Sequence, residues 1–176
     1  ILTKPVGSGV IFNANLKNWV SDAALAECLQ TLTTLNKRAA EILVDFEVHA
    51  ATDITGFGLA GHALEMAQGS AVAVEIDTGA VPIMSEALAM YEKGVSTGVN
   101  AANRALIEAF VHFEKELPIW HQEIFVDPQT SGGLLVSVPA MQGEQVLRAL
   151  RDGGVEEAQQ VGCVKARAGE AFLVFV

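Results

Sequence analysis

The stretch ATDITGFGLAGH, residues 51–62, marks the passage from a β-strand into an α-helix. We expect the strand to cover residues 48–54 and to deliver Asp53 at its C-terminal end. A carboxylate beside the start of a helix can hold a hard cation, while the free N–H groups of the helix attract anionic oxygens. The helix itself is indicated by apolar and small residues at helical spacing, namely Phe57, Ala60, Gly61, Leu64 and Ala67.

Spacing alone leaves two interpretations of Asp53 open. Asp is favoured at helix N-caps and in turns for local hydrogen bonding, and residue type by itself favours that structural role. Thr52, Thr55 and Gly56 favour ligand contact, because they add two hydroxyl groups and a backbone that a ligand can approach closely. One carboxylate does not complete a metal cage, but Mg²⁺ often takes only one or two protein carboxylates together with phosphate oxygens and water.

The remaining sequence predicts an α+β fold, with a mixed β-sheet and helices packed mainly on one face. The length of 176 residues favours a single domain, 1–176. Leucines and alanines at helical spacing predict one long helix over 22–45, and a stretch rich in Gly, Ser, Thr and Asn predicts a loop over 95–103. We expect extended segments at 1–5, 9–12, 71–76, 134–138, 159–164 and 171–176, helices at 84–93 and 142–151, and either a helix or irregular structure at 104–113.

Composition and charge exclude several function classes. The formal net charge of −10, from 21 acidic and 11 basic side chains, argues against a nucleic-acid partner. No run of residues is apolar for long enough to span a bilayer. Cys28 and Cys163 form no C-x-x-C pair, so we expect a reducing, cytoplasmic setting without disulfides or zinc. The start at Ile1, as if within a strand, is typical of a portion excised from a longer protein.

A second polar cluster, DPQTSGG at residues 127–133, also allows two interpretations. It is either an ordinary rigid turn or a nest of backbone N–H groups that receives an anion. No Lys follows the glycines, so the cluster is not a Walker-type loop.

The four histidines predict no metal motif and no nucleophilic site. His62 falls within the predicted helix, where a single His is usually a structural hydrogen-bonding residue. His49, His112 and His121 lie in unrelated contexts and match no H-E-x-x-H spacing. No Ser-His-Asp or Cys-His grouping is evident either.

Four segments together resemble the selenophosphate synthetase family, which belongs to the wider aminoimidazole ribonucleotide synthetase superfamily. ATDITGFGLAGH (51–62) and DPQTSGGLL (127–135) resemble two family signatures. LTKPVG (2–7) is similar to the family's domain-junction stretch, and LNKRAA (35–40) is similar to a helical segment. They occur in the family's order, so the resemblance covers essentially the whole chain.

The resemblance implies that the chain is the C-terminal domain of an enzyme that makes selenophosphate from selenide and ATP. That magnesium-dependent reaction also yields AMP and orthophosphate. The family's ATP-binding N-terminal domain, with its catalytic Cys or selenocysteine and its Lys, is absent from this chain. We therefore expect no catalytic residue here and no activity alone, and we expect a homodimer as the complete enzyme.

The resemblance also assigns residues. Asp53 matches the C-terminal-domain aspartate that joins N-terminal aspartates in binding magnesium at the ATP phosphates. Thr52, Thr55 and Gly56 match positions that shape this cofactor site. The loop 127–133 matches a signature whose contact does not carry over, and Lys4 lies in the junction stretch rather than at the family's catalytic lysine.

Two other functions remain open on the sequence. The chain could be a domain of a purine-pathway synthetase of the same superfamily, which acts on formylglycinamidine ribonucleotide in place of selenide. Alternatively, it could be a noncatalytic dimerisation or regulatory module in which Asp53 is only a helix cap.

Overall fold

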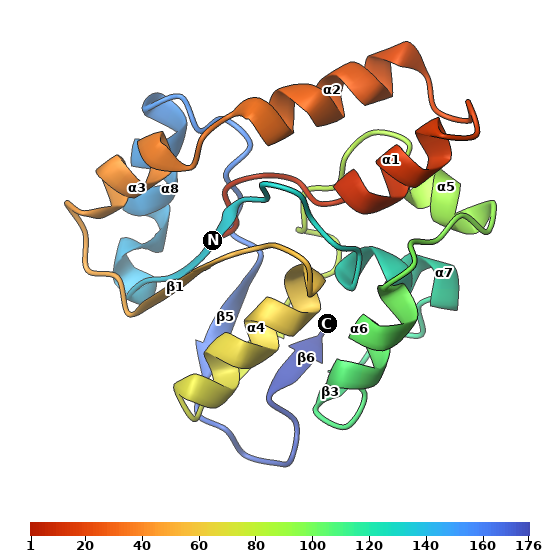
Figure 1. The fold of residues 1–176 in the computed structure, drawn as a ribbon. Coiled ribbons are helices and arrows are strands. Elements are labelled where there is room, and N and C mark those ends of the chain that lie inside the picture. Colours follow the sequence, from red (N-terminus) through yellow and green to blue (C-terminus); the bar gives the residue numbers. More distant parts are fainter.

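The computed structural model describes residues 1–176 and has an α+β architecture (Figure 1). The strands are β1 (Ala50–Asp53), β2 (Ala73–Ile76), β3 (Val111–Phe113), β4 (Leu134–Ser137), β5 (Gly162–Lys165) and β6 (Leu173–Phe175). The α-helices are α1 (Ser8–Asn15), α2 (Asp22–Thr33), α3 (Lys37–Leu43), α4 (Gly58–Gly69), α5 (Ala87–Glu92), α6 (Asn100–Ile107), α7 (Ile119–Gln122) and α8 (Gly143–Asp152), with 3₁₀ turns η1 (Glu123–Phe125) and η2 (Ala140–Gln142). No helix is both long and apolar enough to cross a membrane.

The strands form a mixed four-stranded sheet and a separate antiparallel pair. The sheet has the order β3-β6-β2-β5, in which β6 runs parallel to β3 and β2, and β5 is antiparallel to β2. Helix α4 packs on β2 and β6 and also contacts α6, so both helices lie on one side of the sheet (Figure 1). The expected mixed sheet with helices mainly on one face is confirmed.

The separate pair, β1 with β4, carries the residues of interest. Asp53 lies opposite Leu134 in its register, and Ala50 lies opposite Ser137. The first residues of the chain run along the other edge of β4, where Leu2 bridges to both Leu135 and Gln159. The end of β1 is thereby fixed to the beginning of the chain.

Aromatic side chains fill the centre of the main core. The rings of Phe113 and Phe175 stack 4.7 Å apart, and Phe125 lies 4.6 Å from Phe175. Leu59, Ala60 and other residues from the start of α4 join this core, whereas α3, α8 and β4 enclose a smaller apolar cluster. The N-terminal turn of α4 is therefore buried against the largest hydrophobic cluster in the chain.

Three expected elements are corrected by the structure. Residues 9–12 are helical, within α1, because buried side chains from far along the chain accept the hydrogen bonds of its first turn. The helix expected over 22–45 is interrupted at residues 34–36, where Thr34 is extended and Leu35 is 72% exposed, so α2 and α3 are separate. Helix α6 begins inside the predicted loop 95–103, because Asn100 and Asn103 turn inward and hydrogen-bond.

Gly132 is predicted to be essential for the packing of loop 127–133 against β1. A Cβ atom at this position would lie 2.2 Å from the carbonyl oxygen of Ile54, so the backbone would have to shift. We expect Gly132→Ala to lower the free energy of unfolding by about 1–3 kcal/mol, as overpacking does. Urea denaturation measures the change.

Gly69 provides the matched control. A Cβ atom at Gly69, the last residue of α4, would meet nothing within 4 Å. Gly69→Ala should leave stability unchanged or raise it by up to about 1 kcal/mol. Equal destabilisation by both substitutions would contradict the packing argument.

Candidate functional site

Asp53 is exposed at the point where β1 ends, and its carboxylate has no partner within the chain. The side chain accepts no hydrogen bond and forms no ion pair. The N-cap position of α4 is Phe57, and no side chain caps that helix. Asp53 is therefore not a helix cap, and its charge is available to a ligand.

The backbone between β1 and α4 presents unpaired donors beside Asp53. The N–H groups of Thr55, Gly56 and Phe57 make no hydrogen bond within the chain. In contrast, the carbonyl of Thr55 accepts from Gly58 and Gln129. The free N–H groups of this segment favour an anionic ligand, such as phosphate, because its carbonyls are already hydrogen-bonded. The chain is acidic, so a cation is needed to offset the repulsion between the chain and the anion.

The structure brings only some of the predicted site residues together. Asp53 and Thr55 flank Ile54, which is fully buried; Asp53 is exposed, whereas Thr55 is half-buried and its hydroxyl oxygen lies against His62 of α4. Thr52 lies on the opposite face of β1 from Asp53, because side chains alternate along a strand, and its hydroxyl makes only a 3.4 Å contact with the Asp53 carbonyl. Gly56 is exposed, with its carbonyl bonded to the amide of Asn103.

The sequence pattern around Asn103 predicts a loop residue, whereas the structure makes its side chain part of the site. Its amide nitrogen donates to the carbonyls of Gly56, at 2.8 Å, and Val126, at 2.9 Å, and so ties the end of the β1–α4 segment to the second polar cluster. The side chain is buried. The only available signal was a pair of Asn residues three apart, which equally suits a loop.

The Asp127 side chain has a structural role. Its buried carboxylate accepts hydrogen bonds from the backbone N–H groups of Gly9 and Val10, at 3.0 and 2.9 Å, and from the Tyr91 hydroxyl at 2.5 Å. Gln129 donates to it as well. Asp127 thus acts as the N-terminal cap of α1 from across the chain, which favours the structural interpretation for this residue.

The rest of loop 127–133 braces the Asp53 segment. The Lys4 ammonium, whose pKa is lowered by burial, donates to the carbonyls of Thr34 and Ser131 at 2.6 and 2.9 Å. The carbonyl of Gly133 accepts from the N–H of Ile54. Lys4 is therefore committed to backbone contacts and ties the loop to the end of α2.

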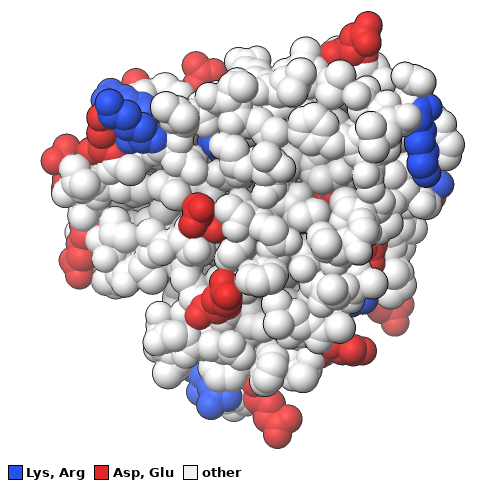
Figure 2. All heavy atoms as spheres, in the orientation of Figure 1, with Lys and Arg blue, Asp and Glu red and all other residues white.

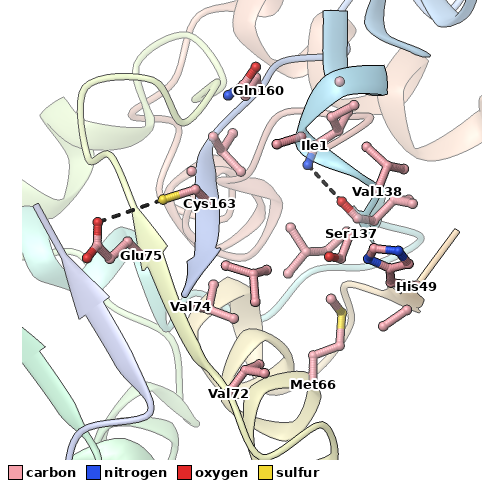
Figure 3. A pocket seen from close by; sticks show the side chains of 18 of the residues that line it. Ile1, His49, Met66, Val72, Val74, Glu75, Ser137, Val138, Gln160 and Cys163 are labelled. Atoms are coloured by element: carbon pink, nitrogen blue, oxygen red, sulfur yellow. Dashed lines mark hydrogen bonds between the residues drawn. The ribbon is translucent and has the colours of Figure 1, made fainter. Parts of the chain in front are cut away.

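A well-formed hollow lies elsewhere in the chain. It has a volume of about 400 Å³ and opens between β4 and the β2–β5 edge, with Val74, Val138 and Cys163 among its lining residues (Figure 3). Its lining is mostly apolar and includes neither Asp53 nor Thr55. The candidate site is thus an exposed strand end rather than an enclosed pocket.

Asp53 fits a magnesium ion as one ligand among several. The chain holds no group of three or more His, Cys, Asp or Glu side chains that could bind a metal by themselves. An unpaired carboxylate beside unpaired N–H groups matches the Mg²⁺ pattern of one or two protein carboxylates plus phosphate oxygens and water. The face in Figure 2 shows only small, separated basic groups and no broad basic surface.

Comparison with known proteins identifies the family. The model of the family described as AIR synthase related protein, C-terminal domain, matches residues 1–174. The chain belongs to this family. Among curated relatives, the selenide, water dikinase of Pseudomonas straminea is 38% identical over 173 residues, which are 98% of this chain and 48% of that protein. That of Myxococcus xanthus is 41% identical over 160 residues, or 89% and 45%.

The chain spans about half the length of these curated relatives, and it resembles their selenophosphate synthetase C-terminal domain as the motifs predicted. Solved structures share its fold. Hydrogenase maturation protein HypE superposes with a TM-score of 0.65 at 20% identity, over 98% of this chain and 47% of that one. The thiamine monophosphate kinase of Aquifex aeolicus gives 0.62 at 18% identity, over 98% and 48%.

Asp127 is predicted to make stability depend on pH. Burial raises the pKa of this carboxyl from 3.8 to about 6, although its hydrogen bonds from Tyr91, Gln129, Gly9 and Val10 act in the opposite direction. Between these values the folded chain binds the proton that the unfolded chain has lost. The stability from this group is therefore complete below about pH 4 and is lost as the pH rises through 6.

The measurement is urea unfolding of the wild type and Asp127→Asn between pH 4 and 7. The Asn variant lacks the titrating group. As the pH rises from 4 to 7, the wild type should therefore lose free energy of unfolding relative to the Asn variant. Identical pH profiles would contradict the assignment.

Proposed function

We propose that the chain is the C-terminal domain of a selenophosphate synthetase, an enzyme that uses ATP and selenide to make selenophosphate with release of AMP and phosphate. The observation that carries the proposal is the unpartnered Asp53 carboxylate at the end of β1, within a chain that matches selenide, water dikinases over nearly its whole length. In this proposal Asp53 provides a magnesium ligand at an ATP site shared with an N-terminal domain.

The residues around Asp53 have separate parts in this proposal. Asp53 holds the cation, and the free N–H groups of Thr55, Gly56 and Phe57 receive phosphate oxygens. Asn103 and loop 127–133 keep the segment in place before ligands arrive. When bound, magnesium supplies positive charge that stabilises the charge on the phosphates.

Isolation of the domain should abolish activity. A single carboxylate and a set of backbone donors include no nucleophile and no general base for the reaction, and the acidic chain would repel free nucleotide. The proposal therefore includes a nucleotide-binding N-terminal domain, and a homodimer as the assembled enzyme. HypE, a protein of the same fold, has been solved in complex with ATP, which makes nucleotide binding plausible for this fold.

The test replaces Asp53 by Ala in the complete enzyme. Loss of a ligand to the phosphate-bound cation should lower selenide-dependent ATP consumption by two or more orders of magnitude. Selenophosphate formation and Mg²⁺-dependent ATP binding are measured together. Asp45→Asn is the matched control, because Asp45 is also exposed and precedes β1 but lies outside the site.

Three results would overturn the proposal. Wild-type turnover by the Asp53→Ala enzyme would remove Asp53 from the site. Activity with formylglycinamidine ribonucleotide, and none with selenide, would assign the chain to a purine-pathway synthetase. Absence of any Mg²⁺-dependent nucleotide binding by the complete protein would leave a dimerisation or regulatory module.

A further inference from the structure

A hydrogen-bonded relay runs from the site into helix α4. The Thr55 hydroxyl oxygen lies 3.0 Å from Nε2 of His62, and Nδ1 of the same ring lies 2.9 Å from a carboxylate oxygen of Glu65. His62 is 8% exposed, whereas the Glu65 side chain is 57% exposed. His62 and Glu65 stand three residues apart on one face of the helix, as this contact requires.

For a neutral imidazole at His62, the proton inventory of the relay sets the direction of each hydrogen bond. An ionised carboxylate only accepts, so Glu65 places a hydrogen on Nδ1 of His62. In a neutral imidazole the other nitrogen is then an acceptor, and Nε2 takes the hydroxyl hydrogen of Thr55. The Thr55 hydroxyl has only this one hydrogen. Its oxygen therefore offers lone pairs, and no N–H or O–H donor, to any other group that approaches it.

Packing holds the ring in this position. The Phe57 ring lies 5.5 Å from that of His62, tilted by 42°. Gly61 makes room for Phe57, because a Cβ atom there would lie 2.6 Å from the Cβ of Phe57. With the ring covered on one side and bonded at both nitrogens, the Thr55 hydroxyl has little freedom to rotate its hydrogen outward.

We propose that Thr55 Oγ1 is a second oxygen ligand for the magnesium ion at Asp53, and that His62, held by Glu65, is the positioning residue that keeps its lone pairs available. This inference rests on the proposed function. Thr55 lies two residues from Asp53, across the buried Ile54, and its half-buried side chain carries the one hydroxyl group in the segment between β1 and α4. A threonine or serine hydroxyl is an established Mg²⁺ ligand beside nucleotide phosphates.

The direction of the relay is tested in the complete protein by NMR with ¹⁵N-labelled histidine. We expect His62 to be the neutral tautomer with hydrogen on Nδ1 and none on Nε2. Thr55→Val, which removes the hydroxyl at nearly constant shape, should move the Nε2 signal of His62 and leave Nδ1 protonated. A hydrogen on Nε2 in the wild type would overturn the proposal.

The ligand role is tested in the complete protein by titrating Mg²⁺ against ATP binding. Thr55→Val should raise the half-saturating Mg²⁺ concentration about tenfold, and Thr55→Ser should restore it. Thr33→Val is the matched control, since the exposed Thr33 hydroxyl bonds only to carbonyls within α2 and its removal should leave the value unchanged. A wild-type Mg²⁺ requirement in the Thr55→Val protein would overturn the ligand assignment.

The positioning role is tested by a double-mutant cycle. His62→Phe should raise the half-saturating Mg²⁺ concentration several fold and leave ATP affinity at saturating Mg²⁺ unchanged. The double variant with Thr55→Val should have the same half-saturating Mg²⁺ concentration as Thr55→Val alone. Additive effects would overturn the relay. If Asp53→Ala also leaves the Mg²⁺ requirement unchanged, the proposed function fails; if only Asp53→Ala raises it, this inference alone fails.

Discussion

The hydrogen bonds to the buried Asp127 carboxylate are the interaction on which the contacts around the site depend. A charge removed from water is costly unless hydrogen bonds replace its hydration. Here two N–H groups from the first turn of α1, the Tyr91 hydroxyl and the amide of Gln129 supply them. The same bonds satisfy the start of α1, offset part of the cost of burying the carboxylate, and join segments more than 100 residues apart.

From this junction the order extends to the site. Loop 127–133 is held by Asp127 at one end and by Lys4 near the other, and it fixes the backbone at Ile54 and Thr55. The polar groups that shape the segment are paired with one another, while the Asp53 carboxylate and three neighbouring N–H groups are not. Rigid surroundings and unpaired functional groups are what a preorganised ligand site requires.

The parts of this structure that were predictable from sequence are those decided locally. Strand β1 and helix α4 follow from residue pattern, and the motif located Asp53 correctly at the strand end. Helix α1 was missed because its capping groups lie over 110 residues away. The relay was missed because its three residues show no catalytic spacing; only the helical turn that begins at Gly58 brings His62 back toward Thr55.

The placement of residues 1–3 has a mechanical consequence. Ile1 and Thr3 hydrogen-bond to Val136 and Leu134 along one edge of β4, and Asp53 pairs with Leu134 on the other. Force applied along the first residues would therefore load several of these hydrogen bonds in shear. Hydrogen bonds loaded in shear break together rather than one after another. Movement at the beginning of the chain would be transmitted through a single strand to Asp53.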